Sequence, residues 1–416
     1  MVMNLSDKQL ADLNIAIADY LRQKGFDETF RIFQTEAKVD NHTLNSKNDT
    51  DALERRWRAV SRLQKKVTDL EKKLQEYETS GVINTSLPGG AIRGSKKGDD
   101  WLPRPPERLE LNGHRASVTR VIFHPIYSVI ASCSEDTTIR IWDFETGDYE
   151  RSLKGHTNVI NDICFDSKGK MLVSCSSDVS IKVWDFTGNY ECLKTLKGHD
   201  ADILAVACLT NSDHVLSGSR DRTVKMWDLT TGYCVFNFCG HDDWIRMIRV
   251  SPDGLSFASA SNDKTVRVWN IQTRQVRSVL SEHEHIVEAV AWAPPQSVQY
   301  IVPGENKENS ESISYILITG SRDKTIRIFN VIQGFCMYTL TGHDNWVRDL
   351  IVHPGGKYII SVGDDRTMRV WCLDQKRNTK TINAHNGFVS CIAMHHSQPY
   401  IATASNDSTI KIWECR

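Results

Sequence analysis

The sequence lacks the features that mark nucleic-acid-binding and membrane proteins. Its formal net charge is only −1, so there is no basic excess to attract a phosphate backbone or an anionic membrane surface. No apolar run approaches membrane-spanning length, and the opening residues, MVMNLSDKQLADLN, contain no apolar core of a signal peptide. We therefore expect no nucleic-acid partner, no export and no membrane insertion.

The eleven cysteines also lack the spacing of a metal site or a redox motif. They form no CxxC pair, and their number is odd. Several lie in strand-like runs, where a free cysteine acts as a small buried hydrophobic residue: Cys133, Cys175, Cys208 and Cys391. This usage indicates a reducing, intracellular compartment and predicts neither a metal nor another cofactor.

The sequence does contain one unit that occurs seven times, mostly at intervals of 42 or 43 residues. In each unit a His is followed by an Asp and, six residues after the Asp, by an aromatic residue. The histidines are His114, His156, His199, His241, His283, His343 and His385. The aspartates are Asp136, Asp178, Asp221, Asp263, Asp323, Asp365 and Asp407. The aromatic residues are Trp142, Trp184, Trp227, Trp269, Phe329, Trp371 and Trp413.

A period of about 40–45 residues with Gly-His and Trp-Asp marks is typical of a four-stranded propeller blade. The pattern resembles the WD-repeat family, and the resemblance implies a mainly β fold, a seven-bladed propeller over residues 107–416. The chain stops three residues after Trp413, so the seventh blade lacks an outer strand. We expect Glu107–Asn112 to supply that strand, which would seal the ring and remove two exposed sheet edges.

A Ser or Thr lies four residues before each Asp and completes a trio that could suggest a hydrolase. An active site normally occurs once, however, and this trio occurs in every repeat, so we expect a structural role and no enzyme activity. The WD-repeat resemblance implies a buried tetrad of Trp, Ser or Thr, His and Asp in each blade. Blade 5 departs from the pattern, because Phe329 replaces Trp and Glu282 replaces the Gly before His283. We expect its tetrad to be incomplete.

Residues 1–40 have the pattern of two short amphipathic helices. Ser6 and Gln9 form a capping-box pattern before the first helix. Two such helices cannot bury their apolar faces unaided, so we expect them to self-associate. The expected contact residues are Leu13, Ile17, Tyr20, Leu21 and Phe30. The string LNIAIADYLRQKGFDETFRIFQTEA resembles the lissencephaly-homology (LisH) dimerisation motif; the alternative is a helical hairpin packed on the same chain.

Residues 51–78 have a heptad pattern that predicts a short coiled coil. Val at a positions and Leu at d positions favours a parallel dimer, and Lys66 faces Glu71 of the partner helix. The core positions are Val60, Leu63, Val67, Leu70 and Leu74. The alternative is a solvated helix lying on the propeller. Residues 79–106 are rich in Gly, Ser and Lys and then in Pro, which predicts a flexible linker.

One group of side chains on the Gly-His face is not required by the repeat. Three residues after the conserved His, blades 4, 6 and 7 carry large aromatic residues. Two arginines follow the tryptophans by two residues, and two others directly precede the conserved Asp of blades 3 and 5. The group comprises Trp244, Trp346, Phe388, Arg220, Arg246, Arg322 and Arg348. Because Trp and Arg are enriched in interface hot spots, we predict a face that binds an acidic, partly apolar partner. The alternative is that the tryptophans simply pack over their own blades.

Repeat 5 is longer than the others by 18 residues. The excess lies near 294–312 (PPQSVQYIVPGENKENSES) and is polar and rich in turn-forming residues. A disordered loop and a partner contact are equally compatible with this composition.

The order of these parts resembles the lissencephaly-1 family, with strings such as TRVIFHP, GHDNWVRDL and the terminal IKIWECR. The resemblance implies a dimeric, non-catalytic regulator of the cytoplasmic dynein motor. It implies that one propeller face engages the motor domain of the dynein heavy chain and that NudE-type coiled-coil adaptors are partners. In animals it also implies a regulatory subunit that accompanies acetylhydrolase catalytic subunits acting on platelet-activating factor.

The same resemblance implies roles in nuclear migration, spindle orientation, cell division and organelle transport. It also implies a location in the cytoplasm, on microtubules and at the centrosome. A second class, a substrate receptor or corepressor scaffold, also combines LisH with WD repeats. The sequence has no F-box-like segment and no clear basic nuclear signal to favour that class. The third class, an enzyme, is disfavoured because no residue is singled out as a nucleophile.

Overall fold

The computed structural model describes residues 14, 17–18, 20–22, 26–37, 101–186, 190–210, 213–301 and 315–416. The chain divides into two units, Met1–Gly94 and Ser95–Arg416, and each is described by itself.

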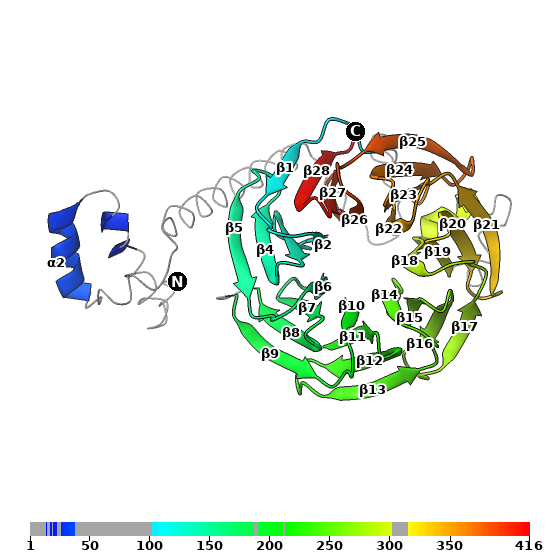
Figure 1. Ribbon diagram of the computed structural model, residues 1–416, viewed down its shortest axis with the longest axis horizontal. Helices are drawn as coiled ribbons and strands as arrows, with labels where there is room; N and C mark the ends of the chain where they lie inside the picture. Colours follow the sequence, from blue (N-terminus) through cyan, green and yellow to red (C-terminus); the bar gives the residue numbers. More distant parts are fainter. Residues whose placement is uncertain are drawn as a thin grey trace, which may run out of the picture. The chain divides into compact units, whose positions relative to one another are not determined.

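The second unit is a ring of seven four-stranded antiparallel sheets, as the repeats predicted (Figure 1). Six blades are built from four consecutive strands, in order from the centre of the ring outward. Blade 1 contains β2 (Val118–Phe123), β3 (Val129–Ser134), β4 (Thr138–Asp143) and β5 (Tyr149–Lys154). Blade 2 contains β6 (Ile160–Phe165), β7 (Met171–Ser176), β8 (Ser180–Asp185) and β9 (Cys192–Lys197). Blade 3 contains β10 (Ile203–Cys208), β11 (His214–Ser219), β12 (Thr223–Asp228) and β13 (Cys234–Cys239).

The remaining blades follow the same plan. Blade 4 contains β14 (Ile245–Val250), β15 (Ser256–Ser261), β16 (Val266–Asn270) and β17 (Val276–Leu280). Blade 5 contains β18 (Val287–Trp292), β19 (Ile316–Ser321), β20 (Thr325–Asn330) and β21 (Phe335–Thr341). Blade 6 contains β22 (Val347–Val352), β23 (Tyr358–Gly363), β24 (Thr367–Cys372) and β25 (Arg377–Asn383). Blade 7 contains β26 (Val389–Met394), β27 (Tyr400–Ser405), β28 (Thr409–Glu414) and, as its outer strand, β1 (Leu109–Asn112).

The ring closes as the sequence predicted. Strand β1 pairs antiparallel with β28, with Leu109 opposite Ile412 and Asn112 opposite Thr409. The first strand of the propeller therefore completes its last blade, and the two ends of the ring are joined by main-chain hydrogen bonds.

The pairing continues beyond β1 toward the N-terminus, which corrects the predicted linker. The N–H of Leu102 donates to the carbonyl of Arg416 at 3.3 Å, and the N–H of Arg416 donates back at 3.1 Å. The indole of Trp101 lies edge-on to the His353 ring, with the centroids 5.5 Å apart. Trp101 and Leu102 both pack against the apolar cluster of blades 6 and 7. The linker prediction, 79–106, was therefore wrong in its last six residues, which belong to the propeller.

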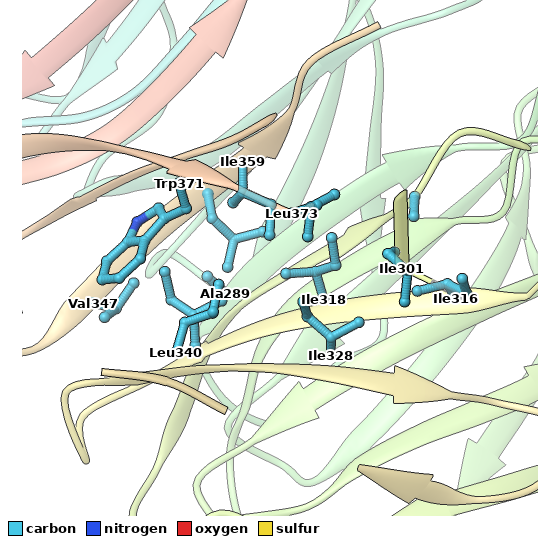
Figure 2. Close-up of a cluster of buried hydrophobic side chains, with 13 residues drawn as sticks. Ala289, Ile301, Ile316, Ile318, Ile328, Leu340, Val347, Ile359, Trp371 and Leu373 are labelled. Atoms are coloured by element: carbon cyan, nitrogen blue, oxygen red, sulfur yellow. The ribbon is translucent and has the colours of Figure 1, made fainter. Parts of the chain in front are cut away.

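The apolar core lies between neighbouring blades, because alternate side chains of each strand point to opposite faces of its sheet. Figure 2 shows one such cluster, in which Ile318 and Ile328 of blade 5 face Ile359 and Trp371 of blade 6. Equivalent clusters fill the other seams, and they hold the blades at fixed positions around the ring.

The described start of the blade-5 insertion is part of this core. It forms a 3₁₀ turn (Pro295–Ser297) followed by the short helix α5 (Val298–Ile301). Ser297 and Ile301 are fully buried, and the hydroxyl of Tyr338 donates to the carbonyl of Ile301 at 3.1 Å. This stretch is thus anchored in the core through Ser297 and Ile301, while Pro295, Gln296 and Gln299 are exposed; residues 302–314 lie outside the described part.

In the first unit, helix α2 (Asp27–Ala37) lies where the second amphipathic helix was predicted. Ala18 is fully buried, and Phe30 and Phe33 pack against it. Phe26 and Ile32 remain 53% and 61% exposed. Leu13 and the coiled-coil positions Val60, Leu63, Val67, Leu70 and Leu74 lie outside the described residues, as does all of 51–78.

Candidate protein-interaction face

Each blade contains a buried chain of polar groups that anchors the Gly-His loop. In blade 2, the indole N–H of Trp184 donates to Ser174 Oγ at 2.8 Å, and His156 Nε2 lies 2.8 Å from the same hydroxyl. His156 Nδ1 lies 2.7 Å from Asp178 Oδ2. Because an indole N–H can only donate, all four groups are satisfied when the serine donates to Nε2 and Nδ1–H donates to the carboxylate. The same hydrogen bonds occur in blades 1, 3, 4 and 6.

Blade 5 departs from the tetrad pattern at two neighbouring positions. His283 still bonds Thr319 at 2.6 Å and Asp323 at 2.7 Å, but Phe329 provides no indole donor. In other blades, a Cβ added to the Gly before the His would meet the indole; in blade 2 the distance from Gly155 to Trp184 would be 3.0 Å. A Trp at this position therefore leaves little room before the His, although blade 7 accommodates the methyl group of Ala384 beside Trp413. Blade 5 loses the Trp and carries Glu282 in place of Gly.

Blade 7 holds its histidine slightly differently. His385 Nδ1 lies 3.4 Å from Asp407 and 3.0 Å from the hydroxyl of Thr409, while Trp413 still donates to Thr403 at 2.9 Å. Blade 7 therefore keeps all four groups of the tetrad, with a longer distance between the imidazole and the carboxylate.

The tetrads are buried networks of hydrogen bonds. Their Ser and Thr hydroxyls are fully buried. Burial lowers the pKa of the His114 imidazole, which keeps the ring neutral. Burial would raise the pKa of Asp136, but hydrogen bonds from Thr138, the Arg115 N–H and His114 outweigh it and lower that pKa to about 2. An ionised carboxylate and a neutral imidazole at neutral pH are a fixed hydrogen-bonding pair.

The tetrads also position the residues at the rim of the ring. In blade 4, Asp263 Oδ2 accepts the N–H of Asp242 at 3.1 Å, which fixes the loop after His241. Two residues further on, the carbonyl of Trp244 accepts the N–H of Asn262 at 2.9 Å. Trp346 and Phe388 make the corresponding hydrogen bonds with Asp364 and Asn406 in blades 6 and 7. Three aromatic side chains are thereby presented by rigid loops.

Two of these aromatic residues are stacked between arginines. The guanidinium carbons of Arg220 and Arg246 lie 4.4 and 5.4 Å from the ring centroid of Trp244. Arg322 and Arg348 lie 4.2 and 5.0 Å from that of Trp346. In each stack one arginine comes from the preceding blade, so each stack crosses a seam. We call the seven predicted residues the docking face: Trp244, Trp346, Phe388, Arg220, Arg246, Arg322 and Arg348.

The arginines of the docking face are partly neutralised by acids that the sequence analysis did not assign to it. Arg220 pairs with Asp202 at 3.0 Å, and Arg322 pairs with Glu288 at 2.5 Å. Arg348 makes two hydrogen bonds to Asp364, at 2.7 and 2.9 Å. Glu288 stands five residues after His283, where Arg246 and Arg348 stand in their own repeats, so a repeat alignment would have found it.

Arg246 differs from the other three arginines, since its Nε donates to the neutral amide oxygen of Asn262 at 2.7 Å. Burial lowers the pKa of Arg246; Glu288 acts in the opposite direction, and the charges of Arg322 and Arg220 lower it further. Four arginines thus share three carboxylates. The local excess of positive charge lies at Arg246, beside an indole that is 36% exposed.

Comparison with known proteins agrees with this architecture. Seven segments match the family described as WD domain, G-beta repeat: residues 106–143, 147–185, 190–228, 232–270, 274–330, 334–372 and 376–414. Residues 7–42 match the PAC1 LisH domain. A Lissencephaly-1 homolog of Caenorhabditis briggsae is 47% identical over 362 residues, which cover 87% of each chain. A Lissencephaly-1 homolog of Glossina morsitans morsitans is 54% identical over 357 residues, which cover 85% of each chain.

The chain belongs to the lissencephaly-1 family. This confirms the resemblance drawn from the repeats and the N-terminal motif, and it confirms the order of a LisH segment followed by seven repeats. Within its described residues, the chain contains no cluster of three or more metal-ligating side chains. Among the helices that the structure describes, none is long and apolar enough to cross a membrane.

Proposed function

We propose that the docking face binds the motor domain of the cytoplasmic dynein heavy chain and that the chain acts as a non-catalytic, dimeric regulator of that motor. The observation that carries the proposal is the pair of Arg–Trp–Arg stacks at the rim. The arginines place positive charge at the rim, although three of them already pair with carboxylates of this chain, and the indoles supply apolar area at low conformational entropy. Membership of the lissencephaly-1 family supports the choice of the motor as partner.

A pull-down from cytosol tests the choice of partner. The full chain should capture the dynein heavy chain, and the variant Trp244→Ala/Trp346→Ala should capture much less. A matched control is Tyr233→Ala/Arg274→Ala: Tyr233 is 76% exposed, and Arg274 lies 4.8 Å from the Phe236 ring on a different part of the propeller. This control should capture as much heavy chain as the wild type. Recovery of ubiquitin-ligase or nuclear corepressor components in place of the motor would favour the receptor class.

The proposal includes dimerisation through residues 1–78. Its support is the match of residues 7–42 to the LisH domain and the exposed apolar side chains Phe26 and Ile32 of the first unit. Light scattering should give a dimer for the full chain and a monomer for residues 101–416. Leu70→Asp should weaken the dimer, because it would bury a charge at a core position of the predicted coil. A monomeric full chain, or a fragment that stays dimeric, would contradict this part.

The proposed cellular context follows from the same partner. NudE-type coiled-coil adaptors would help to recruit the dimer to the motor, in the cytoplasm, on microtubules and at the centrosome. Nuclear migration, spindle orientation, cell division and organelle transport are the processes expected to fail without it. Acetylhydrolase catalytic subunits are further candidate partners of the propeller, and the purified chain itself is not expected to hydrolyse a substrate.

A further inference from the structure

Two cysteine side chains from neighbouring blades lie in direct contact. Cys164 in β6 and Cys208 in β10 place their sulfur atoms 3.1 Å apart. These strands are the innermost strands of blades 2 and 3, so the contact crosses the seam between two sheets. Neither residue belongs to a tetrad or to the docking face.

Equivalent positions recur around the ring: the fifth residue of one innermost strand and the last residue of the next belong to one apolar cluster at other seams. At three other seams the two residues are apolar members of one cluster: Ile122 with Phe165, Ala291 with Val352, and Ile351 with Met394. The position therefore requires packing volume, which two thiols also provide. What the thiols add at this seam is redox chemistry.

We propose that Cys164 and Cys208 are a modification site that forms a reversible disulfide on exposure to a hydroperoxide. The thiolate of one cysteine attacks the peroxide O–O bond, giving a sulfenic acid and an alcohol, or water from hydrogen peroxide. The sulfur of the second cysteine then displaces the hydroxyl group as water and forms the S–S bond. Two electrons pass from the sulfurs to the peroxide, and the two thiol protons end in the released water and alcohol.

The sulfur atoms are already in contact, 3.1 Å apart. The sulfurs need to approach by about 1 Å to reach the S–S distance of about 2.05 Å. Both residues are partly exposed, which gives a small oxidant a route to the pair. Burial raises the pKa of the Cys164 thiol well above its usual value, and the contact with Cys208 raises it further. The reaction should therefore be slow at neutral pH and faster as the pH rises.

Oxidation would tie blade 2 covalently to blade 3. The two residues are 44 positions apart in the chain, so the disulfide would close a long loop in the unfolded state. The oxidised propeller should melt at a temperature higher by on the order of 5 °C. Reduction by dithiothreitol should reverse that shift.

Peptide mapping of the full chain tests the proposal directly. The protein is treated with hydrogen peroxide at pH 8, its remaining thiols are blocked, and it is digested without reductant. A cross-linked peptide pair joining Cys164 to Cys208 is the expected result, removed by dithiothreitol and by Cys164→Ser or Cys208→Ser. The matched control Cys192→Ser removes an exposed thiol of blade 2 and should leave the cross-link intact.

The exposed thiols Cys192, Cys234 and Cys239 show within the same sample that the oxidant has acted. Oxidation of these three while Cys164 and Cys208 remain reduced would overturn the proposal. So would conversion of either residue to a sulfinic acid without pairing. Because the mapping is decisive on the wild-type chain, a serine variant that fails to fold leaves the test intact.

Discussion

The tetrads and the docking face use the same kinds of side chain for different purposes. A tetrad combines an indole with hydrogen-bonded polar groups, and it is buried and present in nearly every blade. The docking face combines indoles with charged groups, but Trp244 is 36% exposed and the Arg–Trp–Arg stacks occur only twice among the described residues. The difference teaches that in a repeat protein the groups present in every unit support the fold. Groups confined to a few units are available for recognition.

A third set of residues shows that burial must be considered together with repetition. Arg120 of blade 1 places Nη1 2.7 Å from Asp349 Oδ2 of blade 6, and its Nε lies 3.4 Å from Asp162 Oδ1 of blade 2. Asp162 also accepts the N–H of Val206 in blade 3 at 3.1 Å, and Asp349 that of Ile392 in blade 7 at 3.1 Å. This ionic group occurs once in the described propeller, yet it is buried and links five blades. We assign it to the fold.

Removing Arg120 should destabilise the propeller more than any of the substitutions that follow. In Arg120→Leu two buried carboxylates lose their positive partner, which typically destabilises a protein by about 3–5 kcal/mol. Thermal and urea unfolding of wild type and variant measure the loss. A variant that melts within a degree of wild type would show that this set is not part of the scaffold.

The pH dependence of that loss has a definite sign. Burial raises the pKa of Asp162 to about 6, although Arg120 opposes the shift. The pKa of Asp162 is higher in the folded state than in the unfolded state. Protonation of Asp162 therefore stabilises the folded state at acid pH, and this contribution is lost as the pH rises through about 6. Without Arg120 the pKa rises further, so the deficit of Arg120→Leu should be larger at pH 8 than at pH 5. An equal deficit at both values would contradict the electrostatic explanation.

Truncation of a tetrad histidine should have the next largest effect. His199→Ala removes one hydrogen-bond partner each from the buried Ser217 hydroxyl and the Asp221 carboxylate, which should reduce stability by about 2 kcal/mol. His283→Ala in blade 5 should reduce it less, because that chain of hydrogen bonds already lacks the indole. Melting temperatures of the two variants decide the order, and an equal loss would mean that the indole contributes nothing to the relay.

Replacing Phe329 and Glu282 of blade 5 by the residues of the other blades should have a smaller, non-additive effect on stability. Phe329→Trp alone should destabilise by about 1 kcal/mol, since the added ring would crowd the side chain of Glu282. Adding Glu282→Gly should remove the clash and supply the missing indole donor, so the double variant should be at least as stable as wild type. Chemical denaturation of both single variants and of the double variant measures the coupling; additive changes would refute it.

The fold was largely predictable because the features that specify it are repeated. Seven copies of one pattern identified the blades, and the missing outer strand of the last blade identified Leu109–Asn112 as the closing strand. Residues 101–106 were assigned to the linker because their prolines resemble those of a loop, while their pairing partners lie more than 300 residues away. A local sequence pattern cannot predict pairing with a segment so distant in the chain.

The candidate site was only partly predictable for the same reason. Aromatic and arginine positions follow from the repeat frame, but which acid pairs with which arginine depends on how the side chains lie in the folded blades. Asp202, Glu288 and Asp364 each pair with an arginine of their own repeat, and Glu288 also lies 3.6 Å from Arg348 of the next blade. The special position of Arg246 became visible only from these pairings.

The most direct test of the docking face is an affinity titration of the dynein motor domain with wild type and with Arg246→Ala/Trp346→Ala. Loss of the uncompensated arginine and of one stacked indole should weaken binding by at least roughly tenfold. The contribution of Arg246 should fade as salt is added, while the dimer and the melting temperature stay close to wild type. The control Tyr233→Ala/Arg274→Ala should bind as wild type does. Unchanged motor affinity in a folded, dimeric Arg246→Ala/Trp346→Ala variant would contradict the central claim that this face holds the partner.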